Sequence, residues 1–154
     1  MQIDDSVLIS ISQNCPNLMS WDCRACARIT NISIDMVFQP DFYHLITKIS
    51  NHCPHLRRLL INSCPSINRI GQFPELHYLG LAGSNVKNVP ISNNLRSLNL
   101  SMCEINSETL LEIGLICPEL TTLNIKKCKE INLVAIETIV KNAKIKVYFA
   151  LMRF

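Results

Sequence analysis

Two cysteines near the start of the chain, Cys23 and Cys26, have a spacing that suits metal binding or redox exchange. A C-x-x-C pair occurs in zinc half-sites and in thiol–disulfide centres. A closed zinc site needs four converging ligands, and no second half-site follows at a zinc-like spacing. We therefore interpret both cysteines as packing residues, since cysteine is readily buried. We expect no metal and no cofactor.

A thiol nucleophile beside its base is the second chemistry to consider, at His52 and Cys53. Neighbouring residues at a helix end do not face each other, and no third group that would orient the base is evident. The four glycines of the chain form no phosphate-binding loop. The sequence thus favours a protein that is not an enzyme.

Most of the cysteines belong to a longer pattern. Five nine-residue segments align without gaps, and they begin at Leu18, Leu56, Leu76, Leu95 and Leu120. Their shared pattern is L-x-x-L-x-L-x-x-C, and its places are called positions one to nine below. Position four holds Trp21, Leu59, Leu79, Leu98 and Leu123. Position six holds Cys23, Ile61, Leu81, Leu100 and Ile125, and position nine is cysteine in every segment except one, where it is Ser84.

This periodicity predicts an α/β fold, namely a right-handed leucine-rich-repeat solenoid. Positions four and six of a strand point to one side, into the core, and positions three, five and seven point to the other. The parallel sheet is expected on the concave face, with helices and extended turns on the convex face. We predict one domain over residues 1–154, with strands near 18–24, 56–62, 76–82, 95–101, 120–126 and 145–151.

The spacing of the segments predicts what connects the strands. The first leucines lie 38, 20, 19 and 25 residues apart. A 25-residue unit has room for a helix, and residues 107–116, with a Ser-Glu opening suited to an N-terminal cap, and 133–142 have helical spacing. Residues 4–14 and 41–52 have it too. The two shorter units are too short for a full helix. The surplus near residues 31–40 is either a longer turn or a binding insertion.

Composition narrows the function classes. Apolar residues make up 48% and charged residues 18%, which excludes a disordered tail. A net charge of +3 is too weak to indicate nucleic-acid binding. The apolar runs are too short to span a membrane, and the N-terminus is acidic where a signal peptide is basic. We expect a cytoplasmic or nuclear protein with reduced cysteines.

Three stretches resemble the cysteine-containing leucine-rich repeats of F-box proteins and of related F-box-free mitotic-exit antagonists. They are Asn14-Cys-Pro-Asn-Leu18, Asn51-His-Cys-Pro-His-Leu56 and Ile116-Cys-Pro-Glu-Leu120, each followed by the position-nine cysteine and then an isoleucine. The resemblance implies capture of a protein destined for ubiquitination. The chain departs from that family because it leaves no room for an F-box before the first repeat and because its two middle repeats are short.

The outward positions of the strands form the candidate binding surface. Arg58 and Tyr78 are adjacent on it, and both residue types are enriched at interaction hot spots. The alternative is an ordinary solvated face. The candidate partner-binding residues are Asp22, Arg24, Arg58, Asn62, Tyr78, Asn99, Asn124 and Lys126.

Two hypotheses about function follow. In the first, the chain is a protein-interaction module that binds a partner on the concave sheet face, of the kind found in ubiquitin-ligase substrate adaptors. In the second, it is a structural subunit or a fragment of a larger assembly. The apolar C-terminal segment, residues 145–154, favours the second because a good solenoid cap has a polar outer face. That segment would also provide a surface for association.

Overall fold

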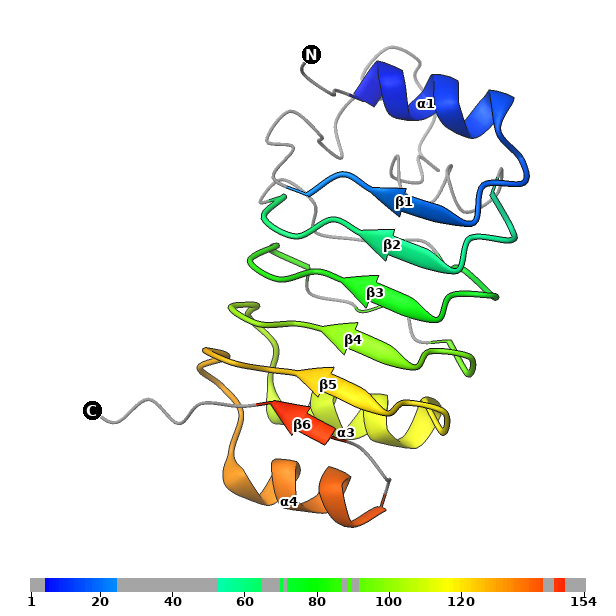
Figure 1. The fold of residues 1–154 in the computed structure, drawn as a ribbon. Coiled ribbons are helices and arrows are strands. Elements are labelled where there is room, and N and C mark those ends of the chain that lie inside the picture. Colours follow the sequence, from blue (N-terminus) through cyan, green and yellow to red (C-terminus); the bar gives the residue numbers. More distant parts are fainter. Residues whose placement is uncertain are drawn as a thin grey trace, which may run out of the picture.

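The computed structural model describes residues 5–24, 53–64, 70, 72–86, 89, 92–142 and 146–148. It is an α/β fold with one six-stranded parallel sheet, in which the strands follow each other in sequence order (Figure 1). The strands are β1 (Ser20–Asp22), β2 (Arg58–Leu60), β3 (Tyr78–Gly80), β4 (Ser97–Asn99), β5 (Thr122–Asn124) and β6 (Lys146–Tyr148). The helices are α1 (Asp5–Asn14), α3 (Ser107–Ile116) and α4 (Leu133–Asn142). The α/β class expected from the sequence is therefore confirmed.

The register of the sheet joins equivalent positions of the aligned segments. Leu59 at position four pairs with Trp21 on one side and with Leu79 on the other. The same row continues through Leu98 and Leu123 and reaches Val147 of β6. Each strand, together with the turn that follows it, is called a layer below and carries its strand's number.

The core lies on one side of the sheet because of strand alternation. In β1 to β5 the middle residue is buried, while its neighbours are mostly exposed or half-buried. The position-one and position-six side chains of layers 2 to 5 are buried as well. Burial of one such leucine contributes about 1.5–3 kcal/mol, so the stacked rows hold the layers together.

Two kinds of turn frame strands β2 to β5. Before the strand, the position-one N–H bonds the carbonyl three residues earlier, as from Leu56 to Cys53 at 3.2 Å. Proline follows that carbonyl residue in four of the five layers, where its fixed φ suits a β-turn. After the strand, position eight adopts a positive φ between 57° and 67°, at Ser63, Gly83, Met102 and Lys127.

Helices connect the last strands. Helix α3 begins after Asn106, whose Oδ1 accepts the Thr109 N–H at 2.9 Å. The cap is thus Asn106 and not the Ser-Glu pair suggested by the sequence, because the hydroxyl of Ser107 bonds Glu130 and Asn132 of the next layer instead. Helix α3 lies behind β5 and contacts α4 (Figure 1).

Some expectations fall on residues that the structure does not describe. The insertion near 31–40, the helix over 41–52, Cys26 and His52 all lie outside the described residues. In the described parts of the two short units no helix occurs. No helix in the described ranges is long and apolar enough to cross a bilayer.

Candidate functional site

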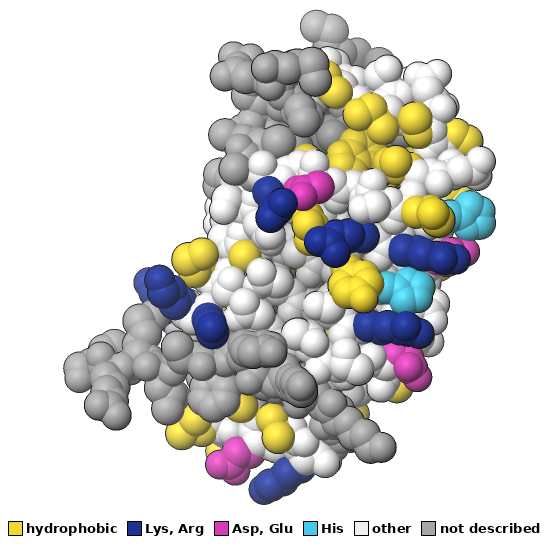
Figure 2. Space-filling view, viewed as in Figure 1, with side chains coloured by type: hydrophobic (Ala, Val, Ile, Leu, Met, Phe, Trp, Pro, Cys, Tyr) yellow, Lys and Arg dark blue, Asp and Glu magenta, His cyan; other side chains and the backbone are white. Residues whose placement is uncertain are grey.

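The exposed face of the sheet carries all eight residues predicted to bind a partner. Figure 2 shows this face, with basic, histidine and aromatic side chains gathered over the starting ends of β2 to β4. Arg58 and Tyr78 lie at those ends, while the other six candidates lie at the strand ends or in the turns that follow. The two ends of the strands differ in what their side chains contact.

Arg58 and Tyr78 form the centre of the starting-end group. They are register partners in β2 and β3, so their side chains project side by side from the sheet. The Arg58 guanidinium lies 5.7 Å from the centroid of the Tyr78 ring, and Tyr78 is 46% exposed. This cation–π contact holds a large aromatic surface and a positive charge together in solvent.

Position two of the neighbouring layers extends this group. Arg57 and Arg96 are exposed and His77 is half-buried, and all three precede their strands directly. We call the set Arg57, Arg58, His77, Tyr78 and Arg96 the strand-start row. Arg57, His77 and Arg96 were not among the residues predicted to bind a partner, because strand alternation assigned only positions three, five and seven to the outward face. The signal that was present is a basic residue at position two in three consecutive segments.

The charges beside this row are only partly compensated. Glu75 pairs with His55 at 2.9 Å and with Arg57 at 3.5 Å. The hydrogen bond from His55 lowers the pKa of the Glu75 carboxyl, with help from the charge of Arg57. Among the residues that the structure describes, no carboxylate lies within salt-bridge distance of Arg58 or Arg96. The row therefore presents net positive charge to solvent.

Asp22 and Arg24, in the first layer, bond each other. The Arg24 guanidinium donates to both carboxylate oxygens of Asp22, at 2.7–3.0 Å. The hydrogen bond from Arg24 is the main reason that the pKa of Asp22 is lowered. Both side chains are exposed, so this pair contributes little to stability.

The three candidate asparagines serve the backbone. Asn99 Oδ1 accepts the Ser101 N–H at 3.1 Å, and Asn124 Oδ1 accepts the Lys126 N–H at 3.2 Å. In both cases a position-five side chain binds the position-seven N–H of its own layer, as an Asx turn does. These side-chain oxygens hold the turn and do not point toward a partner.

Layer 3 has glycine at position five and obtains the same bond from its neighbour. Asn62 Oδ1 of layer 2 accepts the Ala82 N–H at 2.8 Å. A Cβ on Gly80 would lie 2.9 Å from this oxygen and 2.8 Å from Cδ2 of Leu60. Glycine at position 80 therefore makes room for the amide of Asn62.

Position nine carries the buried hydrogen-bond donors. In each of layers 2 to 5 its side chain donates to the position-six carbonyl of the preceding layer. The pairs are Cys64 to Cys23 at 3.4 Å, Ser84 to Ile61 at 2.9 Å, Cys103 to Leu81 at 3.1 Å and Cys128 to Leu100 at 3.1 Å. Burial raises the pKa of Cys103, and that of Cys128 to about 11, so both stay protonated donors at neutral pH.

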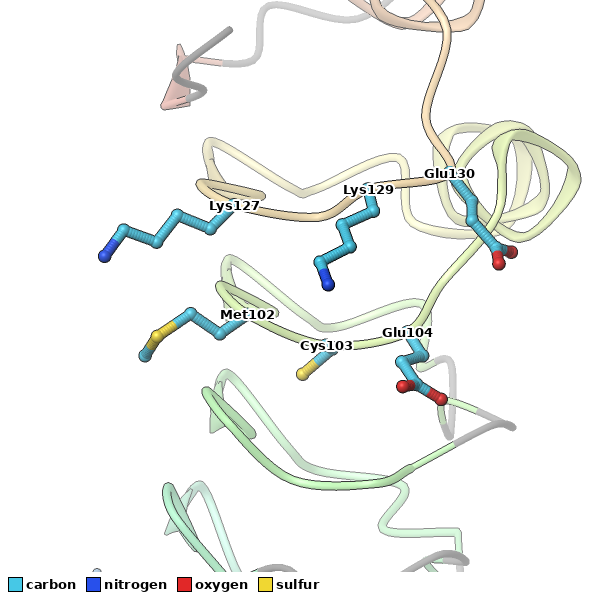
Figure 3. A pocket seen from close by; sticks show the side chains of 6 residues that line it. All are labelled: Met102, Cys103, Glu104, Lys127, Lys129 and Glu130. Atoms are coloured by element: carbon cyan, nitrogen blue, oxygen red, sulfur yellow. The ribbon is translucent and has the colours of Figure 1, made fainter. Parts of the chain in front are cut away.

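A pocket of about 180 Å³ lies over the turns of layers 4 and 5. Figure 3 shows that Lys127 extends beside Met102, while Lys129 reaches toward Cys103. Glu104 and Glu130 lie at the other end of the pocket. The Cys103 thiol bonds a carbonyl and has a raised pKa, so it is a poor nucleophile here. Within the described ranges no group of three metal-ligating side chains converges.

A second exposed surface is apolar and lies on helices α3 and α4. Leu115 is 81% exposed and Val134 is 71% exposed. A hollow of about 200 Å³ between the helices is lined by Leu111, Gly114, Leu115, Thr138 and Ile139. Apolar side chains grouped in this way mark a surface able to contact another macromolecule.

Comparison of the chain with known protein families and with curated proteins finds no match.

Proposed function

We propose that the chain is a protein-interaction module that binds one protein partner on the exposed face of its sheet. The strand-start row carries this proposal, because Arg58 and Tyr78 combine charge and aromatic surface without being used by the fold. Arginine and tyrosine are enriched among residues that dominate binding energy. Asn62, Asn99 and Asn124 contribute shape, since their side-chain oxygens accept backbone N–H groups of the turns.

We further propose that the six layers form a leucine-rich-repeat solenoid with this face on its concave side. The sequential order of parallel strands and the equivalent register of position four support it. Concave sheet faces suit binding because they offer an extended surface on a rigid stack. A cytoplasmic or nuclear protein without nucleic-acid affinity accords with the modest charge.

The substrate-adaptor role in ubiquitin ligation is the finer form of this proposal. Its support is the resemblance of the Cys-Pro and position-nine cysteine pattern to that repeat class. The hydrogen bonds that Cys64, Cys103 and Cys128 donate to the preceding layer give a physical reason for the pattern, but one that serves the fold. The partner is therefore better sought through the sheet face than through the cysteines.

The second candidate function is a structural subunit of a larger assembly. Its support is the apolar surface of α3 and α4, where Leu115 and Val134 are mostly exposed. Light scattering on the purified chain tests it. A stable oligomer that the double variant Leu115→Ser/Val134→Ser converts to monomer supports a subunit, whereas a monodisperse monomer argues against it.

The main proposal is tested by affinity capture followed by identification of the bound proteins. Arg58→Ala/Tyr78→Ala should lose the partner that the wild-type chain retains. Leu115→Ser/Val134→Ser, a double change on the helices, is the matched control and should retain it. Loss of the partner in the helix variant together with its retention in the sheet variant would overturn the proposal.

A further inference from the structure

We propose that the strand-start row binds a short acidic segment of the partner in extended conformation. This inference deepens the proposed function, on which it rests, because it names the chemistry that the row recognises. The row has two parts, a pair of uncompensated guanidinium groups and an exposed aromatic ring between them.

The uncompensated charges come first. Asp22 is neutralised by Arg24, and Glu75 by His55 and Arg57. Glu119 has the place in layer 5 that Glu75 has in layer 3, yet it makes no salt bridge to Arg96. Arg58 and Arg96 thus lack a bonded carboxylate among the described residues. A carboxylate of the partner could pair with each of these arginines through two parallel hydrogen bonds, the bidentate geometry that arginine favours.

The backbone fixes the spacing of these groups. Arg58 belongs to β2 and Arg96 directly precedes β4, and β3 with Tyr78 lies between them. Neighbouring strands lie about 4.8 Å apart, so the two arginines start from backbone about 10 Å apart across the sheet. An extended segment in the polyproline II conformation has three residues per turn and rises about 3.1 Å per residue, so residues three positions apart share a face about 9 Å apart. Two acidic residues three positions apart can therefore meet both guanidinium groups.

Tyr78 supplies the apolar contact between the charges. Its ring is about half exposed and is held by the Arg58 guanidinium on one side. A leucine between the two acidic residues of the segment would pack on the remaining ring surface. This combination explains why an aromatic residue is placed in an otherwise basic row.

The row fits an acidic peptide better than a nucleic acid. Nucleic-acid surfaces depend on many lysines and arginines that follow a phosphate backbone. Here only Arg58 and Arg96 of the row make no salt bridge to a described carboxylate, and the charge of Arg58 also helps to lower the pKa of Asp22. Glu75 and Glu119 flank the row, and the chain carries a net charge of only +3. A short segment with two carboxylates matches that charge.

Fluorescence anisotropy with the full chain tests the proposal. The probe is a labelled peptide, Gly-Ser-Glu-Leu-Ser-Glu-Ser-Gly, and its control has glutamine in place of both glutamates. A labelled oligothymidine of similar length provides the nucleic-acid arm. We expect the acidic peptide to bind about tenfold more tightly than the glutamine peptide, and to weaken as salt rises.

Two charge-reversed variants decide where the peptide binds. Arg58→Glu/Arg96→Glu should weaken binding of the acidic peptide by about tenfold or more. Lys127→Glu/Lys129→Glu makes the same change in net charge at the pocket of Figure 3 and should alter binding less than about twofold. Thermal unfolding of both variants checks that the fold is kept.

The possible outcomes distinguish a failure of the acidic-segment inference from a failure of the proposed protein-binding function. Equal weakening in both double variants, equal binding of the acidic and glutamine peptides, or tighter binding of oligothymidine overturns the acidic-segment inference. If Arg58→Ala/Tyr78→Ala still loses the captured partner, the interaction module stands and only its recognition chemistry is wrong. If that variant retains the partner, the proposed function fails as well.

Discussion

At the starts of β2 and β3, Arg58 and Tyr78 contact each other and solvent, whereas at the ends of the strands polar side chains bond the chain's own backbone. Arg58 touches Tyr78, but Asn99 and Asn124 accept backbone N–H groups two residues onward. Side chains on the same exposed face thus differ in whether they contact other side chains and solvent or hold the backbone of a turn. Exposure alone does not mark a binding residue, and the internal bonds of each side chain must be known.

The largest change in stability is expected from a substitution in the core, which supports both ends of the strands. Leu98 is 1% exposed in the middle of the position-four row. Leu98→Ala should lower the free energy of unfolding by about 2–5 kcal/mol, because it removes buried contacts and leaves a cavity. Urea unfolding measures the change. An unchanged urea midpoint would mean that the position-four leucines do not form the core beneath the exposed sheet face.

The next effect concerns the buried donor of layer 3. Ser84→Ala should cost about 1–3 kcal/mol, because the hydrogen bond from Ser84 to the Ile61 carbonyl is lost in a buried site. Ser84→Cys is the control, since Cys103 makes the equivalent bond in layer 4. We expect the cysteine variant to be the more stable of the two in thermal unfolding. The reverse order would contradict a donor role for position nine.

A smaller loss is expected at the strand-end asparagine. Asn99→Ala should cost about 0.5–1.5 kcal/mol, because the Ser101 N–H loses its acceptor. Asn99→Asp keeps an oxygen at the same place and should lose less. Both are measured by urea unfolding. Should Asn99→Ala instead abolish partner capture at unchanged stability, the division between the two strand ends would be wrong.

The strand-start residue should behave in the opposite way. Arg58→Ala should change the free energy of unfolding by less than about 1 kcal/mol, since it removes an exposed cation–π contact. The same variant should weaken partner capture. Arg58→Lys retains the charge and tests whether the planar guanidinium is required. A large loss of stability in Arg58→Ala would assign this residue to the fold.

The smallest effect is the titration of Glu75. Its pKa is lowered by His55 and Arg57, so its pairs are present above the ordinary glutamate pKa and are lost as pH falls through the lowered value. Replacing His55 with glutamine should raise the Glu75 pKa toward its usual range. NMR of the side-chain carboxyl carbon follows this titration. An unchanged Glu75 pKa in His55→Gln would show that His55 is not its partner.

The rows of the core could be predicted because they depend on periodicity. Five aligned segments place Leu59, Leu79 and Leu98 in one register, and alternation assigns them to the buried side. The helix over residues 107–116 was predictable from spacing, but its cap was not. Asn106 and Ser107 both suit a cap, and only the contacts of the next layer decide between them.

The candidate site was less predictable, because strand alternation tells which side of the sheet a side chain faces but not which groups it hydrogen-bonds. The pattern places Asn99 outward, yet a short amide can turn back to a nearby N–H. Position two was overlooked since Arg57 and Arg96 precede the strands, where alternation has not begun. Recurrence of residue type at one position across segments is the signal that would have found them.

The hydrogen bond from position nine gives the stack a polarity. Layers 2 to 5 each donate to the layer before them, so layers 2, 3 and 4 both donate and receive this bond. If a gene segment that encodes one whole layer is duplicated or deleted, each position-six carbonyl still meets a position-nine donor from the next layer. A break inside a layer separates the position-nine donor from its strand. The array can therefore lengthen or shorten by whole layers, and its exposed sheet face then changes width in steps of one strand.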